Sequence, residues 1–306
     1  MNEIYVSCSP HIRAKDSTQS IMRDVLIALV PALIAAVVHY GIRPLILVAV
    51  CVVFAVASEY VMEKLCKRPV TISDLSAVVT GVLLAYNLPV GLPIWMAALG
   101  AVAAVAFVKQ LFGGIGQNFA NPAITGRIIL LISFAGKMTD WATGYPDAIS
   151  GATPLAAAAT EGAVLPSLSN LFLGNINGCI GETSKLALLI GFAYLLFRRI
   201  ITWHTPVAFV GTVFVLMLLL GKDPVYQVLS GGLMLGAIFM ATDYATTPSN
   251  SKGRVIFGIG AGLLTVLIRV FGNYPEGVSF AILLMNIMTP HIENLTESKP
   301  LGGAKA

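Results

Sequence analysis

The sequence predicts an all-α polytopic membrane protein, and two observations on its composition carry that prediction. Of its 306 residues, 57% are hydrophobic and only 11% are charged, whereas soluble domains carry about 25% charged residues. The hydrophobic residues also form blocks long enough to cross a bilayer, without the weak alternation of outer-membrane strands. These features exclude a soluble cytosolic enzyme, a disordered chain, a collagen-like fibre and a disulfide-rich secreted scaffold. The net charge of +4 gives no nucleic-acid signal.

About ten apolar segments follow one another along the chain, in two groups of five separated by a long polar loop. They run over Val25–Tyr40, Pro44–Met62, Leu75–Leu88, Leu92–Phe112, Ala123–Ala135, Lys185–Phe197, Thr205–Gly221, Val228–Ala241, Val255–Phe271 and Val278–Pro290. We expect each group to form one five-helix repeat. The expected organisation is a cytoplasmic N-terminal segment at 1–24, a first repeat at 25–135, an extracytoplasmic loop at 136–184, a second repeat at 185–290 and a cytoplasmic tail at 291–306.

The basic residues predict the orientation in the membrane. With the N-terminus inside and the segments alternating, fourteen Lys and Arg residues fall on the cytoplasmic side. Five fall outside, namely Arg43, Lys137, Lys185, Lys222 and Arg269. Cytoplasmic loops carry the excess of Lys and Arg in membrane proteins. We therefore predict a multi-pass protein of the cell inner (cytoplasmic) membrane, with both termini in the cytoplasm.

Four segments, the third, fifth, eighth and tenth, are short for membrane-spanning helices. They have roughly 13 or 14 residues, where about 20 are needed. The two halves also share a faint echo, because Thr80–Leu84 resembles Leu235–Phe239 and Lys109–Gly113 resembles Ile268–Gly272. Since five is odd, the second repeat must be inverted relative to the first. Short or broken helices in an inverted repeat indicate a binding site near the midplane; short helices in a thinned bilayer are the alternative.

The outer loop contains a helix-start motif between Asp147 and Leu155. Thr153 is suited to an N-cap, because Pro154 favours the first helical position and a helix-forming run follows. Ser150 and Gly151 form a turn before it. A helix start offers free N–H groups to an anion, so a phosphate esterified to Thr153 is one interpretation of this motif. A simple capped loop helix is the other.

A glycine-rich stretch, Gly113–Pro122, leads into the short fifth segment. It can form a glycine turn in which Asn118 caps the next helix. Alternatively, Asn118 and Asn121 present two amides on one side of a half-helix. Amides both donate and accept hydrogen bonds, which suits the edge of a flavin ring or a purine.

Few acidic residues lie near the apolar segments. They are Asp24, Glu59, Asp74 and Asp243. Ionisable groups at membrane depth indicate function, but all four lie near cytoplasmic segment ends, where solvated placement is the competing interpretation.

The stretch Gly113–Ala123 followed by Asp147–Leu155 resembles the D subunit of the Rnf complex, an ion-translocating ferredoxin:NAD oxidoreductase. It is also similar to the B subunit of the sodium-translocating NADH:quinone reductase. Trp203–Pro206, Ala241–Pro248 and Asn250–Arg254 extend the resemblance over nearly the whole chain. The chain lacks the long N-terminal arm of the quinone-reductase protein, which favours the Rnf branch.

The resemblance implies specific cofactors. The threonine that closes the Ser150-Gly151-Ala152-Thr153 motif carries covalent FMN through a phosphoester in the family. The two asparagines of the glycine-rich stretch, Asn118 and Asn121, line a non-covalent riboflavin site in the quinone-reductase relative. The family fold is similar to urea and ammonium transporter bundles with inverted five-helix repeats. No metal site is expected.

The implied function is that of a flavoprotein component in an electron-transfer translocase. Such a component relays electrons through covalent FMN while the complex moves Na⁺ or H⁺, and it is not expected to be active alone. The implied partners are Rnf subunits A, B, C, E and G, with the lipid bilayer around them. The alternative is a urea- or ammonium-channel-like solute transporter without redox function.

Overall fold

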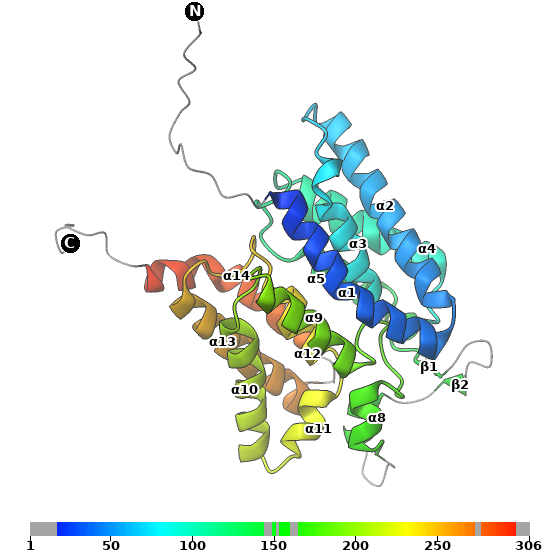
Figure 1. The fold of residues 1–306 in the computed structure, drawn as a ribbon, viewed down its shortest axis with the longest axis vertical. Coiled ribbons are helices and arrows are strands. Elements are labelled where there is room, and N and C mark those ends of the chain that lie inside the picture. The colour runs from blue at the N-terminus through cyan, green and yellow to red at the C-terminus, as the bar shows by residue number, and fades with distance from the viewer. Residues whose placement is uncertain (1–16, 144–148, 151–152, 160–164, 273–276, 298–306) are drawn as a thin grey trace, which may run out of the picture.

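The computed structural model describes residues 17–143, 149–150, 153–159, 165–272 and 277–297, and it is predominantly helical (Figure 1). The first part contains α1 (Thr18–Tyr40), α2 (Arg43–Leu65), the 3₁₀ turn η1 (Ile72–Asp74), α3 (Ser76–Tyr86), α4 (Ile94–Val102), the π-helix η2 (Ala103–Gln110) and α5 (Pro122–Ser133). The connecting region contains α6 (Ala135–Met138), β1 (Ala142–Thr143), β2 (Ile149–Ser150), α7 (Pro154–Ala159) and α8 (Leu168–Leu173). The last part contains α9 (Lys185–Phe197), α10 (His204–Leu219), α11 (Pro224–Leu229), α12 (Leu233–Leu235), the π-helix η3 (Gly236–Met240), α13 (Ser251–Phe271) and α14 (Val278–Thr296).

The predicted all-α membrane fold is confirmed, and every predicted apolar segment overlaps a helix. Three helices, α1, α2 and α13, are long and apolar enough to cross a membrane, and shorter apolar helices accompany them. α1 begins earlier than predicted, because Ser17 and Ser20 form a capping box ahead of the apolar run. The predicted end of the last helix at Pro290 is too early, since α14 continues to Thr296.

The four segments predicted to be short behave in three ways. The tenth is not short, because α14 has 19 residues. α3 and α5 are regular helices of 11 and 12 residues. The eighth segment is broken: α11 ends at Leu229, and α12 starts afresh after Gly231, whose φ of 65° suits glycine. α12 continues directly into η3, so Leu233–Met240 forms one short half-helix.

The helix contacts pair equivalent elements of the two predicted halves. Across the halves, α1 packs against α9 and α5 packs against α14. Within them, α2 packs against α4, and α10 packs correspondingly against α13. The two matching segments Thr80–Leu84 and Leu235–Phe239 each place their glycine close to a neighbouring helix. A Cβ on Gly81 would lie 2.8 Å from Val52 Cα, and one on Gly236 would lie 2.6 Å from Val278 Cγ1. These pairings are those expected of two five-helix repeats; the repeat boundaries stay a prediction.

The end of the predicted outer loop, residues 175–184, is packed into the bundle. The N–H groups of Ile180 and Gly181 donate to the carbonyls of Leu88 and Tyr86, at 3.1 and 2.9 Å. Those carbonyls belong to the C-terminal end of α3, which has no further helical partner for them. A Cβ on Gly181 would lie 2.4 Å from Tyr86 Cβ, so this contact requires glycine. The segment therefore completes the end of a short helix.

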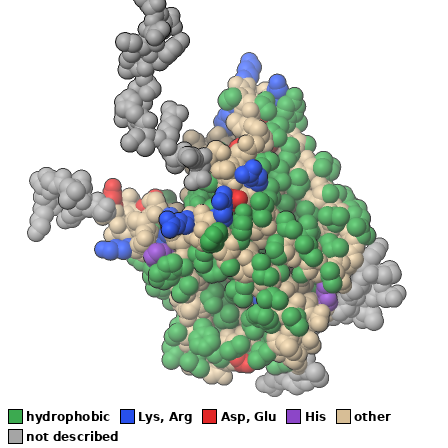
Figure 2. Space-filling model, viewed as in Figure 1, with side chains coloured by type: hydrophobic (Ala, Val, Ile, Leu, Met, Phe, Trp, Pro, Cys, Tyr) green, Lys and Arg blue, Asp and Glu red, His purple; other side chains and the backbone are tan. Residues whose placement is uncertain are grey.

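The surface is mostly apolar. Val38 and Phe197 are 82% and 85% exposed, which is the arrangement expected where lipid replaces water. Figure 2 shows hydrophobic side chains over most of one face, with Lys and Arg concentrated toward its upper edge. Two cations predicted to be cytoplasmic, Lys109 and Arg127, depart from this pattern because both are buried. Arg127 belongs to α5, and its Nη1 donates to Ser279 Oγ at 2.6 Å.

Candidate functional site

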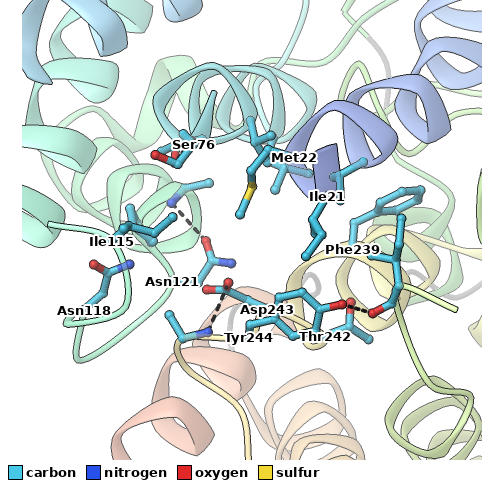
Figure 3. Close-up of a pocket in the computed structure, with 18 of the residues that line it drawn as sticks. Ile21, Met22, Ser76, Ile115, Asn118, Asn121, Phe239, Thr242, Asp243 and Tyr244 are labelled. Carbon is cyan, nitrogen blue, oxygen red and sulfur yellow. Dashed lines mark hydrogen bonds between the residues drawn. The ribbon is translucent and has the colours of Figure 1, made fainter. Parts of the chain in front are cut away.

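A cavity of about 100 Å³ lies where several helix ends meet (Figure 3). The starts of α1, α3 and α5 contribute to it, together with the end of α9 and the residues that follow η3. Its apolar wall includes Ile21, Met22 and Phe239. Its polar groups include amides, hydroxyls, a carboxyl group and an amine. A mostly apolar cavity with a few polar groups is the usual form of a small-molecule site.

Both predicted asparagines, Asn118 and Asn121, line this cavity. Asn121, not Asn118, caps α5: its Oδ1 accepts from the N–H groups of Ala123 and Ile124, at 3.0 and 3.3 Å. The interpretation of Asn118 as the cap is therefore wrong, because α5 begins at Pro122. Asn118 Oδ1 is buried and has no hydrogen-bond donor among the described residues.

The loop before α5 takes its shape from glycine. Gly113, Gly114 and Gly116 have φ values of 131°, 100° and 83°, a region that other residues rarely adopt. Through these turns the chain passes from the end of η2 to the cavity wall, where Asn118 lies. The glycine-rich pattern thus reflects backbone geometry that places an amide at the cavity.

Asn286 of α14 connects two loops beside the cavity. In the orientation of its amide that satisfies both neighbours, its oxygen accepts from Asn121 N–H at 3.0 Å, and its nitrogen donates to Thr246 O at 3.2 Å. No sequence signal points to this residue, because it lies inside an apolar helix and its partners are distant in the chain.

Asp243 lies at the cavity wall, in the loop after η3. Thr246 Oγ1 donates to its Oδ2 at 3.1 Å, and the Ala245 N–H lies 3.5 Å from its Oδ1. Burial raises the pKa of this carboxyl above its ordinary value, against the opposing effect of these hydrogen bonds. A raised pKa at a cavity wall is typical of functional sites.

A buried ion pair lies beside the cavity. Lys109, which lines the cavity, pairs with Glu59 and donates to Ser76 Oγ at 2.6 Å. Gln110 Nε2 also donates to Glu59 Oε1, at 2.9 Å. The interpretation of Glu59 as a solvated end residue is therefore wrong, since its exposed fraction is 0%. Its partner follows it by 50 positions.

Asp24 is also buried rather than solvated. Its Oδ2 accepts from Arg198 Nη2 at 2.9 Å, and its Oδ1 accepts from Tyr194 Oη at 2.9 Å. Both donors belong to the C-terminal end of α9, so the pair joins the first helices of the two halves at the cavity end of the bundle.

Thr153 is buried and directly precedes α7, so it occupies the N-cap position that the sequence predicts. Its carbonyl accepts from the Ala157 N–H at 2.8 Å. α7 is fixed to the bundle, because Tyr226 Oη donates to Pro154 O at 3.2 Å. A Cβ on Gly231 would lie only 2.5 Å from Leu155 Cδ1, so α7 rests on the glycine turn before α12.

The predicted attachment motif includes three residues before Thr153. Ser150 belongs to β2, where it is paired with Ala142 of β1. Gly151 and Ala152 lie outside the described residues.

Two cations lie near the Thr153 end of the bundle. Lys185 is fully buried, and its Nζ donates to the carbonyls of Glu182 and of Gly231, the latter at 3.3 Å. Arg269 Nη2 donates to Ser230 O at 3.2 Å, and it would lie 3.4 Å from a Cβ on Gly231. The charge pattern of the sequence predicts both cations on the outer side, without indicating that they converge on one glycine.

The two predicted sites lie at opposite ends of the same helices. α9 has Lys185 at one end and the cavity residue Leu195 near the other, about 15 Å apart along the axis. The half-helix Leu233–Met240 follows Gly231 and reaches the cavity at Phe239. The described residues contain no cluster of His, Cys, Asp and Glu that could hold a metal ion.

The fold and these sites define a polytopic α-helical membrane protein with buried polar groups at both ends of its bundle. A family model described as the NQR2, RnfD, RnfE family matches residues 5–302. The chain belongs to this family.

Curated relatives match over nearly their whole length. The chain is 52% identical to the D subunit of the Na⁺-translocating ferredoxin:NAD⁺ oxidoreductase complex of Acetobacterium woodii, covering 100% of this chain and 98% of the relative. It is 42% identical to the D subunit of the proton-translocating ferredoxin:NAD⁺ oxidoreductase complex of Clostridium ljungdahlii, covering 98% and 97%. It is 39% identical to the D subunit of the ion-translocating oxidoreductase complex of Pseudomonas aeruginosa, covering 97% and 96%.

Proposed function

We propose that this chain is the flavin-bearing membrane component, the D subunit, of an ion-translocating ferredoxin:NAD oxidoreductase of the Rnf type. It relays electrons through FMN esterified to Thr153, and the complex couples this transfer to movement of Na⁺ or H⁺. Its partners are Rnf subunits A, B, C, E and G. Its family membership and the names of its full-length relatives support the proposal.

One observation carries the redox part of the proposal: two polar sites occupy opposite ends of one bundle, joined by α9 and by the half-helix before the cavity. A relay across a membrane needs one redox group toward each side. A solute channel has no need of a helix-capping threonine that is fixed against the bundle at one end.

The residues around Thr153 fit a phosphoester. Thr153 supplies a hydroxyl, which such a linkage requires, and α7 holds it against the glycine turn before α12. Lys185 and Arg269 bring positive charge to that turn and compensate the phosphate. FMN bound there supplies reversible electron acceptance; the protein supplies the tether and the compensating charge.

The cavity residues fit a second, non-covalent flavin, which we assign as riboflavin. Asn118 Oδ1 is a buried acceptor without a donor among the described residues, and a flavin ring edge carries an N–H donor that it can receive. Asn121 Nδ2 has only a long contact of 3.5 Å to Met240 O, so it remains available to a ring carbonyl.

The test is in-gel ultraviolet fluorescence. The complex is produced together with its flavin transferase, and the protein is then denatured and separated on a gel. We expect the wild-type band to be fluorescent. Thr153→Val should abolish this fluorescence, and it should also abolish ferredoxin-linked electron transfer in the assembled complex. Folding should survive, because a lost cap costs roughly 1 kcal/mol. Thr153→Ser should retain partial attachment.

The matched control is Thr139→Val, which removes an exposed hydroxyl from the same region of the chain. It should leave the fluorescent band unchanged. A fluorescent Thr153→Val band would place the attachment elsewhere. A flavin-free wild-type band would favour the channel-like transporter.

A further inference from the structure

Three hydrogen-bonded side chains, Asp74, Ser76 and Lys109, connect the turn η1 with the cavity. Lys109 Nζ donates to Ser76 Oγ at 2.6 Å, and Ser76 Oγ donates to Asp74 Oδ1 at 2.5 Å. Lys109 and Ser76 line the cavity, and Figure 3 shows Ser76 at its wall. We call these three side chains the polar row. It is a continuous line of exchangeable protons from η1 to the cavity.

The Asp74 end of the polar row reaches the surface of the protein. Asp74 is half-buried, and Ser73 beside it in η1 is exposed. Its Oδ1 accepts from both the N–H and the hydroxyl of Ser76, at 2.8 and 2.5 Å. Its Oδ2 receives no hydrogen bond from the described residues. This carboxyl can therefore exchange a proton with water, on the side that the sequence predicts to be cytoplasmic.

The Lys109 end has a proton to give to the cavity. Lys109 is 2% exposed, and two of the three N–H groups of its ammonium donate to Glu59 and Ser76. The third has no acceptor among the described residues. Because Lys109 is a wall residue, this third N–H is available to a group inside the cavity. The ion pair with Glu59 holds Lys109 in place and favours its charged form.

Asp243 offers a proton acceptor at the wall of the same cavity. Its Oδ2 accepts from Thr246, but its Oδ1 has only the long contact of 3.5 Å to the Ala245 N–H. Burial raises the pKa of this carboxyl, and the Lys109 ammonium is close enough to oppose that effect. The cavity volume of about 100 Å³ exceeds the roughly 10–15 Å³ that one water needs, so water can connect Lys109 with Asp243.

We propose that the polar row is a proton path that connects the surface of the protein with Asp243 in the cavity. Lys109 passes the proton of its third N–H through water to the Asp243 carboxylate and becomes an amine. The amine takes the Ser76 hydroxyl proton, and Ser76 takes a proton from Asp74, which has received it from water. Each member of the polar row then has the protons that it had at the start, and one proton has entered the cavity.

Such a path has a use in redox chemistry, and this part of the inference rests on the proposed function. A flavin that accepts two electrons also takes up protons. A cavity formed by packed helix ends needs a route for them, and the polar row ends at its wall. Asp243 then holds a proton beside the flavin.

The test follows the carboxyl proton of Asp243 by infrared spectroscopy of the purified complex after transfer from H₂O to D₂O. The signal is the C=O band of a protonated carboxyl that Asp243→Asn removes. Ser76→Ala interrupts the polar row and should slow hydrogen–deuterium exchange of this band by about a hundredfold, the lower end of what a positioned proton donor contributes. The frequency and amplitude of the band should stay the same. Ser76→Thr keeps the hydroxyl and should restore exchange to near the wild-type rate.

Ser58→Ala is the matched control. It removes another buried serine hydroxyl, which donates within α2 to Phe54 O at 2.6 Å and does not line the cavity. It should leave the exchange rate unchanged. A purely structural role of Ser76 would lower thermal stability without slowing exchange. Equal exchange rates in wild type and Ser76→Ala, or the absence of a band that Asp243→Asn removes, would overturn the proton path.

The flavin part is tested separately, by following the absorbance of the non-covalent flavin during its reduction. Ser76→Ala should slow the proton-coupled phase and leave the midpoint potential unchanged, because a path alters the rate of proton transfer and not its equilibrium. A wild-type reduction rate together with slowed infrared exchange would show that the path does not serve the flavin. If the wild-type complex holds no non-covalent flavin, the second-flavin assignment fails, and the infrared measurement alone decides the path.

Discussion

Asn118 and Asn121 line the same cavity but use their side-chain oxygens in opposite ways. Asn121 Oδ1 accepts two backbone N–H groups at the start of α5, whereas Asn118 Oδ1 is buried without a donor among the described residues. One asparagine therefore holds the helix, and the other retains an unused acceptor, to which we assign the proposed flavin. This division makes their substitutions distinguishable.

Asn118→Leu should remove the non-covalent flavin while leaving the fold intact. The substitution deletes an acceptor that receives no hydrogen bond, so the free energy of unfolding should change by less than about 1 kcal/mol, whereas flavin binding should weaken by about 1–3 kcal/mol. The measurement is flavin content and thermal stability of the purified complex. Asn121→Leu should instead lower both, because it removes a cap worth about 1 kcal/mol. Unchanged non-covalent flavin in the double variant would refute the assignment; the covalent flavin should persist in all three.

Removing one member of the Glu59–Lys109 pair should destabilise the protein much more than removing both. Lys109→Met leaves a buried carboxylate without its cation, which costs about 3–5 kcal/mol. Adding Glu59→Gln should recover most of this loss, since Gln110 can still donate to the neutral amide oxygen. A double-mutant cycle on thermal unfolding measures the coupling. Strictly additive effects would show that the pair does not act as a unit.

Asp243 should make stability fall as pH rises. Burial raises its pKa in the folded protein, so the folded state favours the protonated carboxyl. That contribution is complete below the ordinary pKa of 3.8 and is lost as pH rises through the folded-state value. Asp243→Asn cannot ionise, so it should gain stability relative to wild type as pH increases. Thermal midpoints of both proteins across a pH series test this. A constant difference would contradict it.

The orientation can be tested with cysteine labelling from the two sides of the membrane. Cys66 follows α2 and is exposed, on the side predicted to be cytoplasmic. It should react with an impermeant maleimide only after the membrane is permeabilised. In a Cys66→Ser background, Lys222→Cys beyond the end of α10 should react in intact cells. The reverse pattern would invert the topology.

The positions of the apolar helices and the closeness of Asn118 to Asn121 could be predicted from the sequence, because both depend on local signals. Apolar runs set the ten segments, and the glycine-rich loop places Asn118 and Asn121 beside one another in the chain. The break before α12 was also readable in principle, since Ser230 is followed by two glycines. Only its consequence, a half-helix that runs from one site to the other, needed the structure.

The buried charges could not be read from the sequence, since their partners are far apart in it. Asp24 and Arg198 are separated by 174 positions, and Glu59 and Lys109 by 50. A carboxylate near the end of an apolar segment looks solvated until the tertiary fold covers it. The π-helices could not be predicted for the same reason. η2 brings Lys109 and Gln110 together at Glu59, an arrangement that depends on tertiary packing rather than on local propensity.

The packing of residues 175–184 against α3 constrains how the chain matures during biosynthesis. Asn87 O accepts a hydrogen bond from Cys179 Sγ, which lies 92 residues further along the chain. Tyr86 O likewise accepts from the Gly181 N–H. Until the ribosome has delivered that segment, the end of α3 keeps carbonyl groups without these partners, at a cost that is severe in an apolar environment. The first half alone therefore lacks these partners, and we expect the end of α3 to become fully hydrogen-bonded only after the residues just before α9 have been synthesised.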